Sequence, residues 1–201
     1  MKKDLFEHKS KKWDMSSKRV ENAKNISNVI LKNIDIEKYK TILDLGAGTG
    51  LLSYFISPKI KNIIAIDNSP SMLNELREKR HEFPSCLEVV ESDIFKYNHP
   101  TLVDGIISSM TIHHIQDIKA LFVKLFNMIK VGGFIAIADL DSEDGTFHSN
   151  NEGVYHFGFD RIELKKVALE AGFDNIHFET ANIIKKPHRD FTIFTMIAKK
   201  S

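Results

Sequence analysis

The 201-residue chain has one cysteine, one tryptophan and a formal net charge of only +1. Because Cys86 stands alone, we expect no internal disulfide and no cysteine-based metal site. The balanced charge gives no support for a nucleic-acid partner or an anionic membrane surface. The amino end lacks the apolar core of a signal peptide, and no apolar run approaches membrane-spanning length. The composition therefore predicts one cytoplasmic domain, monomeric or homodimeric, with neither a membrane partner nor a metal.

The stretch with the most specific pattern is Thr41–Gly50, TILDLGAGTG. Its short apolar run is typical of a central parallel strand that is covered on both faces. Three glycines then omit side chains where the chain turns, which permits positive φ and lets backbone N–H groups approach a ligand. Apolar residues recur at helical spacing after Gly50, so a helix is predicted to begin with its amino end at this loop.

The pattern DLGAGTG resembles motif I of the class I S-adenosylmethionine-dependent methyltransferases. The resemblance implies that Asp44 begins the cofactor loop. It also implies that the amino-acid end of S-adenosylmethionine lies over Gly46, Ala47, Gly48 and Gly50. The dinucleotide fingerprint G-x-G-x-x-G fits less well, because Leu51 occupies the place of its last glycine. Three alternatives remain open: an NAD-type Rossmann oxidoreductase, a non-catalytic module that binds S-adenosylmethionine, and a tight turn without a ligand.

A second apolar run, Asn62–Asp67, ends in an acid about twenty residues after the glycine loop. That spacing suits a carboxylate that accepts hydrogen bonds from the ribose hydroxyls. A plain helix cap is the alternative, although Ser69 and Pro70 already offer one. The resemblance implies that Asp93 meets the adenine amine while two apolar neighbours hold the ring. The other cofactor-side candidates are Asn68, Met72, Ile94, Phe95 and Ser109.

The first forty residues, 1–40, contain no glycine or proline and carry an amphipathic apolar stripe. They are predicted to form a helical cover packed on the sheet edge. In the methyltransferases that the chain resembles, a similar segment often covers the cofactor. The resemblance therefore makes Trp13 and Arg19 candidates for cofactor contact.

The rest of the chain alternates between short apolar runs and helical stripes, and it ends in a hairpin over residues 173–199. Gly132 and Gly133 are expected to cap the helix before the fifth strand. The predicted fold is α/β, a Rossmann-like seven-stranded and mostly parallel sheet with a reversed last strand. The resemblance implies the strand order 3-2-1-4-5-7-6, with helices on both faces, and a single class I methyltransferase domain over residues 1–201.

The acceptor side is predicted after the fourth and fifth strands. His113 and His114 follow the fourth strand, and on an extended segment they would face opposite ways, one buried and one near the acceptor. Residues 141–160 form a long polar loop at a strand's carboxyl end, where open α/β sheets bind ligands. It is interpreted as a wall of the acceptor pocket, although a solvated loop is the alternative. The candidates for acid–base catalysis are His113, His148, Tyr155 and His156, each of which also suits a structural role.

The acceptor class is narrowed by what is missing after the fourth strand, which runs into SSMT. Enzymes that methylate exocyclic amines of bases or protein glutamine carry an Asn/Asp-Pro-Pro-aromatic run there. Cys86 lies at the predicted start of the third strand, away from the site, which disfavours a cysteine-nucleophile enzyme. The sequence therefore predicts a small-molecule acceptor and S-adenosylmethionine as the only cofactor.

Overall fold

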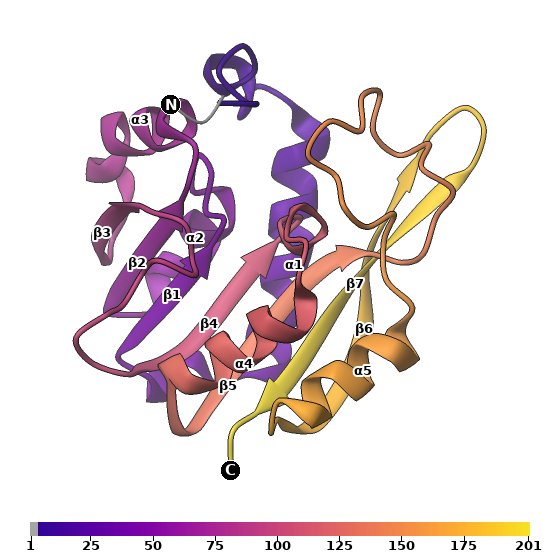
Figure 1. The fold of residues 1–201 in the computed structure, drawn as a ribbon. Coiled ribbons are helices and arrows are strands. Elements are labelled where there is room, and N and C mark those ends of the chain that lie inside the picture. Colours follow the sequence, from indigo (N-terminus) through magenta and orange to yellow (C-terminus); the bar gives the residue numbers. More distant parts are fainter. Residues whose placement is uncertain (1–3) are drawn as a thin grey trace.

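A computed structural model describes residues 4–201 (Figure 1). Seven strands form one sheet in the order β3-β2-β1-β4-β5-β7-β6. The strands are β1 (Thr41–Leu45), β2 (Asn62–Asp67), β3 (Cys86–Glu91), β4 (Val103–Ser109), β5 (Ile129–Leu140), β6 (Asp174–Lys185) and β7 (Asp190–Lys199). The α-helices are α1 (Ser17–Asn33), α2 (Leu51–Ile56), α3 (Pro70–Glu78), α4 (Ile118–Met128) and α5 (Arg161–Glu170).

The strand directions confirm the predicted sheet. β1 pairs in parallel with β2 and β4, and parallel pairing continues to β3 on one side and β5 on the other. β7 is the reversed strand, antiparallel to both β5 and β6. Because β1 and β4 are central neighbours whose connections leave in opposite directions, the switch point of the sheet lies at their carboxyl ends. This region, called the crevice below, is where such sheets bind ligands.

The helices lie on both faces because side chains on a strand alternate between them. Ile42 of β1 packs into one core together with residues of α1, α2 and α3. Its neighbours Leu43 and Leu45 pack into the other core with residues of α4 and α5. Figure 1 shows the same layering, with α1 behind the sheet and α4 and α5 in front of it. The glycine loop is thus held by a strand buried on both faces.

Two local predictions differ from the structure. Residues 1–40 are not one helix: α1 covers Ser17–Asn33, and residues 4–14 form turns around a short 3-10 segment, while the first three residues lie outside the described part. Gly132 and Gly133 do not cap α4, which ends at Met128. The chain turns directly into β5, whose pairing with β4 is irregular before Gly105 pairs with Phe134. Backbone pairing has overridden the capping preference of glycine there.

Candidate functional site

The glycine loop has the backbone geometry that its sequence predicts. Gly46, Gly48 and Gly50 have φ values of 68°, 55° and 83°, all in the left-handed region. A Cβ on Gly46 would lie 2.2 Å from a side-chain atom of Thr111, so the loop is pressed against the segment that follows β4. Gly48 is less crowded, since a Cβ there would meet only the Cε atom of Met72, at 3.1 Å. The loop therefore has most room at Gly48.

Asp67 connects this loop to the amino end of α3. Its Oδ2 atom accepts a hydrogen bond from the Gly48 N–H, and its Oδ1 atom accepts one from the Ser69 N–H, each at 2.8 Å. Burial raises the pKa of the Asp67 carboxyl, and these backbone N–H groups oppose that shift. Each carboxylate oxygen has a second lone pair, so Asp67 retains capacity for further donors.

Asp44, at the end of the motif strand, is buried with 1% of its surface exposed. Its Oδ2 atom accepts a hydrogen bond of 2.6 Å from the Ser53 hydroxyl on α2. Burial raises its pKa to about 7, against the effect of the Ser53 bond, and the charge of nearby Asp67 adds to the rise. Two carboxyl groups, Asp44 and Asp67, therefore lie beside the glycine loop.

The remaining cofactor-side candidates flank these two acids. Met72 is buried on α3 beside Gly48, whereas Asn68 is exposed. Asp93 follows β3, and its Oδ1 atom accepts a hydrogen bond of 2.9 Å from the Phe95 N–H. Ile94 is buried and the Phe95 side chain is 44% exposed. Ser109 ends β4 and is half-buried. All except Ser109 lie near the carboxyl ends of β2 and β3.

Residues 4–14, here called the N-terminal strap, contact the glycine loop and α3. The Asp4 carboxylate accepts hydrogen bonds from the Ser69 hydroxyl and the Ser71 N–H at the start of α3. The Asp14 carboxylate accepts a hydrogen bond of 2.6 Å from the Thr49 hydroxyl in the loop, and it also pairs with Lys79. These contacts tie both ends of the strap to the glycine loop and to α3.

The strap also reaches His114 and the 141–160 loop. The Phe6 ring packs edge-to-face against Trp13, with centroids 5.8 Å apart, and against His114, with centroids 5.9 Å apart. A Cβ on Gly153 would lie 2.6 Å from the Leu5 side chain, so the strap also contacts the 141–160 loop. Arg19 stacks over Trp13, with its Cζ atom 3.9 Å from the ring centroid. The strap therefore bridges the two sides of the crevice.

The histidine pair lies differently from the prediction. His113 and His114 belong to a 3-10 turn, η5 (Ile112–His114), and not to an extended segment. Their rings lie side by side, with centroids 4.1 Å apart, so the prediction that they face opposite ways is wrong. A 3-10 turn rotates successive side chains by about a third of a circle, where a strand would invert them. The prediction that one of them is buried and hydrogen-bonded is confirmed by His113, which is 1% exposed.

His113 forms an ion-pair-like contact with Asp139, a residue that the sequence did not single out. The Nδ1 atom of His113 lies 2.7 Å from the Asp139 Oδ1 atom, and Asp139 is fully buried near the end of β5. His148 joins the cluster from the 141–160 loop, its ring centroid 5.0 Å from that of His113. Sequence spacing gave no indication of Asp139, because it lies within an apolar strand pattern.

The other two catalytic candidates lie near this cluster but less centrally. The backbone N–H of Tyr155 donates a hydrogen bond to the His113 carbonyl, while the Tyr155 side chain is 57% exposed. The His156 Nε2 atom lies 3.0 Å from the Ile115 carbonyl oxygen, and its ring stacks on Phe159. Their contacts hold the 141–160 loop against η5, and of the loop's candidates only His148 places its ring against His113.

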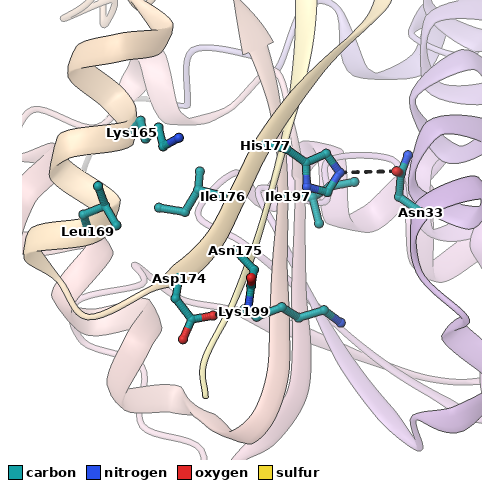
Figure 2. Close-up of a pocket in the computed structure, with 9 residues that line it drawn as sticks. All are labelled: Asn33, Lys165, Leu169, Asp174, Asn175, Ile176, His177, Ile197 and Lys199. Atoms are coloured by element: carbon teal, nitrogen blue, oxygen red, sulfur yellow. Dashed lines mark hydrogen bonds between the residues drawn. The ribbon is translucent and has the colours of Figure 1, made fainter.

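A hollow of about 630 Å³ lies at the opposite end of the sheet (Figure 2). It borders the start of β6 and the end of β7, where the His177 Nε2 atom lies 3.2 Å from the Asn33 Oδ1 atom. Lys199 of β7 pairs with Phe134 near the start of the fifth strand, so the hollow is far from the carboxyl ends of the parallel strands. None of the site residues predicted from the sequence lines it.

Comparisons with known proteins agree with this geometry. Residues 42–133 match a family model described as a methyltransferase domain. An uncharacterized methyltransferase of Schizosaccharomyces pombe is 31% identical over 152 residues, which cover 71% of this chain and 53% of the relative. A trans-aconitate 2-methyltransferase of Enterobacter is 26% identical over 148 residues, or 73% of this chain and 52% of the relative. A probable ribosomal RNA small subunit methyltransferase A of Methanosphaera stadtmanae is 33% identical over 87 residues, or 43% of this chain and 32% of the relative.

The chain belongs to the class I S-adenosylmethionine-dependent methyltransferases, of the type whose domain model it matches. This membership decides against the dinucleotide oxidoreductase alternative. The chain spans about half the length, or less, of these curated relatives. Among the described residues no helix is both long and apolar enough to cross a membrane.

Two solved structures support the fold. A methyltransferase from Clostridium acetobutylicum aligns with a TM-score of 0.70 at 19% identity, covering 88% of this chain and 91% of that one. The N-methyltransferase NodS from Bradyrhizobium japonicum, in complex with S-adenosylhomocysteine, aligns with a TM-score of 0.72 at 13% identity, covering 94% of this chain and 91% of that one. The cofactor that this family membership implies is S-adenosylmethionine. The site fits that group, because the Asp67 carboxylate retains acceptor capacity for hydroxyl donors and Gly48 leaves space beside the loop.

Proposed function

We propose that the chain transfers the methyl group of S-adenosylmethionine to a small-molecule acceptor. The supporting observation is that the crevice is covered: the N-terminal strap contacts α3, the glycine loop, His114 and the 141–160 loop. His113, Gly48 and Thr49 are all buried beneath or beside this cover. A small molecule needs only a local opening to enter such a site, whereas a macromolecule needs both covering segments to withdraw.

The proposed residue roles follow the position of each group. We infer that the glycine loop faces the amino-acid end of the cofactor, that Asp67 faces the ribose, and that Asp93 and its apolar neighbours face the adenine. We further infer that the strap and α1, as the amino-terminal cover, contribute Trp13 and Arg19. The full set of proposed cofactor-binding residues is Trp13, Arg19, Asp44, Gly46, Ala47, Gly48, Gly50, Asp67, Asn68, Met72, Asp93, Ile94, Phe95 and Ser109.

The reaction requires few catalytic groups from the protein. When bound, S-adenosylmethionine supplies a methyl group on a positively charged sulfur, which is already an activated leaving group. The residues of this chain orient the acceptor in line with that methyl group and exclude water, which is where most of the rate enhancement of such a reaction arises. We propose that residues 141–160 form one wall of the acceptor site, and that His113, His148, Tyr155 and His156 are its candidates for acid–base work.

The proposal is tested with methyl-labelled S-adenosylmethionine and three acceptor fractions from a cell extract: an ultrafiltrate of small molecules, total RNA and total protein. Label is expected in the ultrafiltrate, and the Gly48→Val variant, checked for folding, serves as the inactive control. Label found only in RNA would replace the small-molecule acceptor with a nucleic acid, as the ribosomal RNA relative suggests. Tight binding of S-adenosylhomocysteine with no label in any fraction would favour a non-catalytic binding module.

A further inference from the structure

Asp139 is held rigidly as an anion inside the protein. It is 0% exposed, and its Oδ1 atom accepts a hydrogen bond of 2.8 Å from the Leu140 N–H. Its Oδ2 atom accepts a hydrogen bond of 3.2 Å from the His113 N–H. Burial alone would raise the pKa of this carboxyl, but the His113 ring and the two backbone N–H groups outweigh burial and lower it.

An ionised Asp139 determines the tautomer of His113. The His113 Nδ1 atom lies 2.7 Å from Oδ1 of Asp139, and a carboxylate only accepts hydrogen bonds, so Nδ1 carries the proton. In the neutral form of the ring, the Nε2 atom is then a bare acceptor. This Nε2 atom is buried, and it has no hydrogen-bond partner among residues 4–201. A buried nitrogen without a partner costs free energy, which a ligand that donates a hydrogen bond would recover.

His148 presents a second such nitrogen. Its Nε2 atom is likewise buried and has no hydrogen-bond partner within the described chain. Its ring lies 5.0 Å from the His113 ring and 6.0 Å from the His114 ring, measured between centroids. Burial and the neighbouring histidines lower the pKa of His148 to about 4, so this ring is neutral near pH 7. Two unpartnered ring nitrogens therefore occur together beside the end of β4.

We propose that His113 is the general base of the reaction, that Asp139 is the positioning residue that orients it, and that the accepting atom is an amine nitrogen or a hydroxyl oxygen. This inference rests on the proposed function and narrows its substrate class. A carboxylate acceptor is disfavoured on two grounds. It has no proton to donate to a bare Nε2 atom, and its charge would be repelled by the buried Asp139 anion.

The step balances without any further reactant. The His113 Nε2 atom takes the proton from the O–H group of a hydroxyl acceptor or from an N–H group of an ammonium acceptor, and the freed electron pair forms the new bond to the methyl carbon. The pair of the broken carbon–sulfur bond stays on sulfur, which leaves neutral S-adenosylhomocysteine. The proton on His113 is stabilised by Asp139 until it passes to solvent. The acceptor gains one methyl group and loses one proton.

The stability of the product toward alkali tests the substrate class. Methyl esters of carboxylates release volatile labelled methanol in alkali, whereas methylated amines and methyl ethers keep their label. We expect the product formed from the ultrafiltrate to retain its label after alkali treatment. Release of labelled methanol would overturn the inference while leaving the proposed methyl transfer intact, and absence of any labelled product would instead count against the proposed function.

Histidine NMR tests the tautomer without any turnover. In protein labelled with ¹⁵N-histidine, the resonances of His113 are assigned by their loss in the His113→Gln variant. The neutral ring is expected to show a protonated Nδ1 and a bare Nε2 nitrogen, and Asp139→Asn is expected to abolish this preference. A protonated Nε2 in the parent protein would overturn the inference. His177→Gln, at the opposite end of the sheet, is the control that leaves the His113 signals unchanged.

The pH dependence of activity in the His113→Gln variant separates a catalytic role of His113 from a structural one. The titratable and charged groups that face His113 and His148 are Asp139 on β5, His114 on η5 and Lys186 after β6. We expect His113→Gln to lower kcat/KM by about 10²- to 10⁴-fold near pH 7, the usual contribution of a general base. The loss should shrink as the pH rises, because hydroxide then removes the proton. A loss that is equal at every pH in a folded variant would show that His113 is only structural.

Discussion

Asp67 accepts a hydrogen bond from the backbone N–H of Gly48, with 2.8 Å between the nitrogen and Oδ2. The acid at the end of β2 therefore helps to shape the loop at the end of β1. One residue thus serves two purposes: it supports the loop, and it remains available to a ligand that lies across both strand ends.

Replacing Asp67 is expected to weaken the cofactor site. The Asp67→Ala variant should lose at least about 1–3 kcal/mol of S-adenosylhomocysteine affinity, the cost of an unmade hydrogen bond to a buried polar group. Calorimetric titration measures this loss. Asp174→Ala, in the hollow at the far end of the sheet, is the control that should bind as the parent does. Equal affinity of Asp67→Ala and the parent would show that the ribose lies elsewhere.

Substitutions at two glycines with positive φ distinguish the effect of losing cofactor contact from the effect of backbone strain. Gly48 and Gly132 both have positive φ, at 55° and 82°, and a Cβ on Gly132 would meet nothing within 4 Å. Gly48→Val should abolish S-adenosylhomocysteine binding in a folded protein, whereas Gly132→Val should cost only stability, on the order of 1–3 kcal/mol. Circular dichroism and calorimetric titration on the same samples give both quantities. If Gly48→Val still binds, the loop is only a structural turn.

Trp13 is the chain's single tryptophan and lies in the strap, which makes it a spectroscopic reporter. Its ring contacts Phe6 and lies under Arg19, and the strap holds the glycine loop through Asp14. Binding of S-adenosylhomocysteine is therefore expected to change the tryptophan fluorescence, with a midpoint equal to the calorimetric Kd. Asp14→Ala should lower the affinity by removing the bond to Thr49. An unchanged spectrum at saturation would mean that the strap does not respond to the cofactor.

The raised pKa of Asp44 makes stability depend on pH. Its carboxyl has a pKa of about 7 when folded and 3.8 as a model compound, so the folded state holds its proton more tightly. Between about pH 4 and pH 7 this group therefore lowers the free energy of unfolding as the pH rises, by up to about 4 kcal/mol. Asp44→Asn keeps an acceptor for the Ser53 hydroxyl but cannot ionise. Relative to the parent it should be more stable at pH 8 and nearly equal at pH 4.

Denaturant unfolding of both proteins over this range measures the difference. A stability difference that does not change with pH would mean that Asp44 is already ionised, or already neutral, throughout the range.

The 141–160 loop is expected to act on the acceptor and not on the cofactor. Alanine at His148, Tyr155 or His156 should leave S-adenosylhomocysteine affinity unchanged, and at least one variant should lower methyl transfer by about tenfold or more. The His148 variant is expected to show the largest effect, because its ring lies against His113. His188→Ala, outside the loop, is the control. If all three variants transfer methyl groups at the rate of the parent, the loop is only a solvated connection.

Most of the fold could be predicted from the sequence. Alternation and apolar runs locate the strands, and Ser69, Asp117 and Asp160 accept the N-cap hydrogen bonds that begin α3, α4 and α5. The motif strand and its glycine loop follow from local chemistry alone, because positive φ is inexpensive only for glycine. The sequence by itself thus determined the strands and the position of the glycine loop and, through its resemblance to a known family, the sheet order.

Only the tertiary structure decided which residues meet across the crevice. Asp139 lies within an apolar strand, so no local pattern distinguished it, and its partner His113 comes from a different strand end. The 3-10 turn that brings His113 and His114 together is likewise set by packing against β5, through the His113 N–H bond to Asp139. A sequence pattern predicts the helix or strand to which a residue belongs. A buried charged residue and its partner come together only when separate elements pack against each other. The contact between His113 and Asp139 belongs to this second kind.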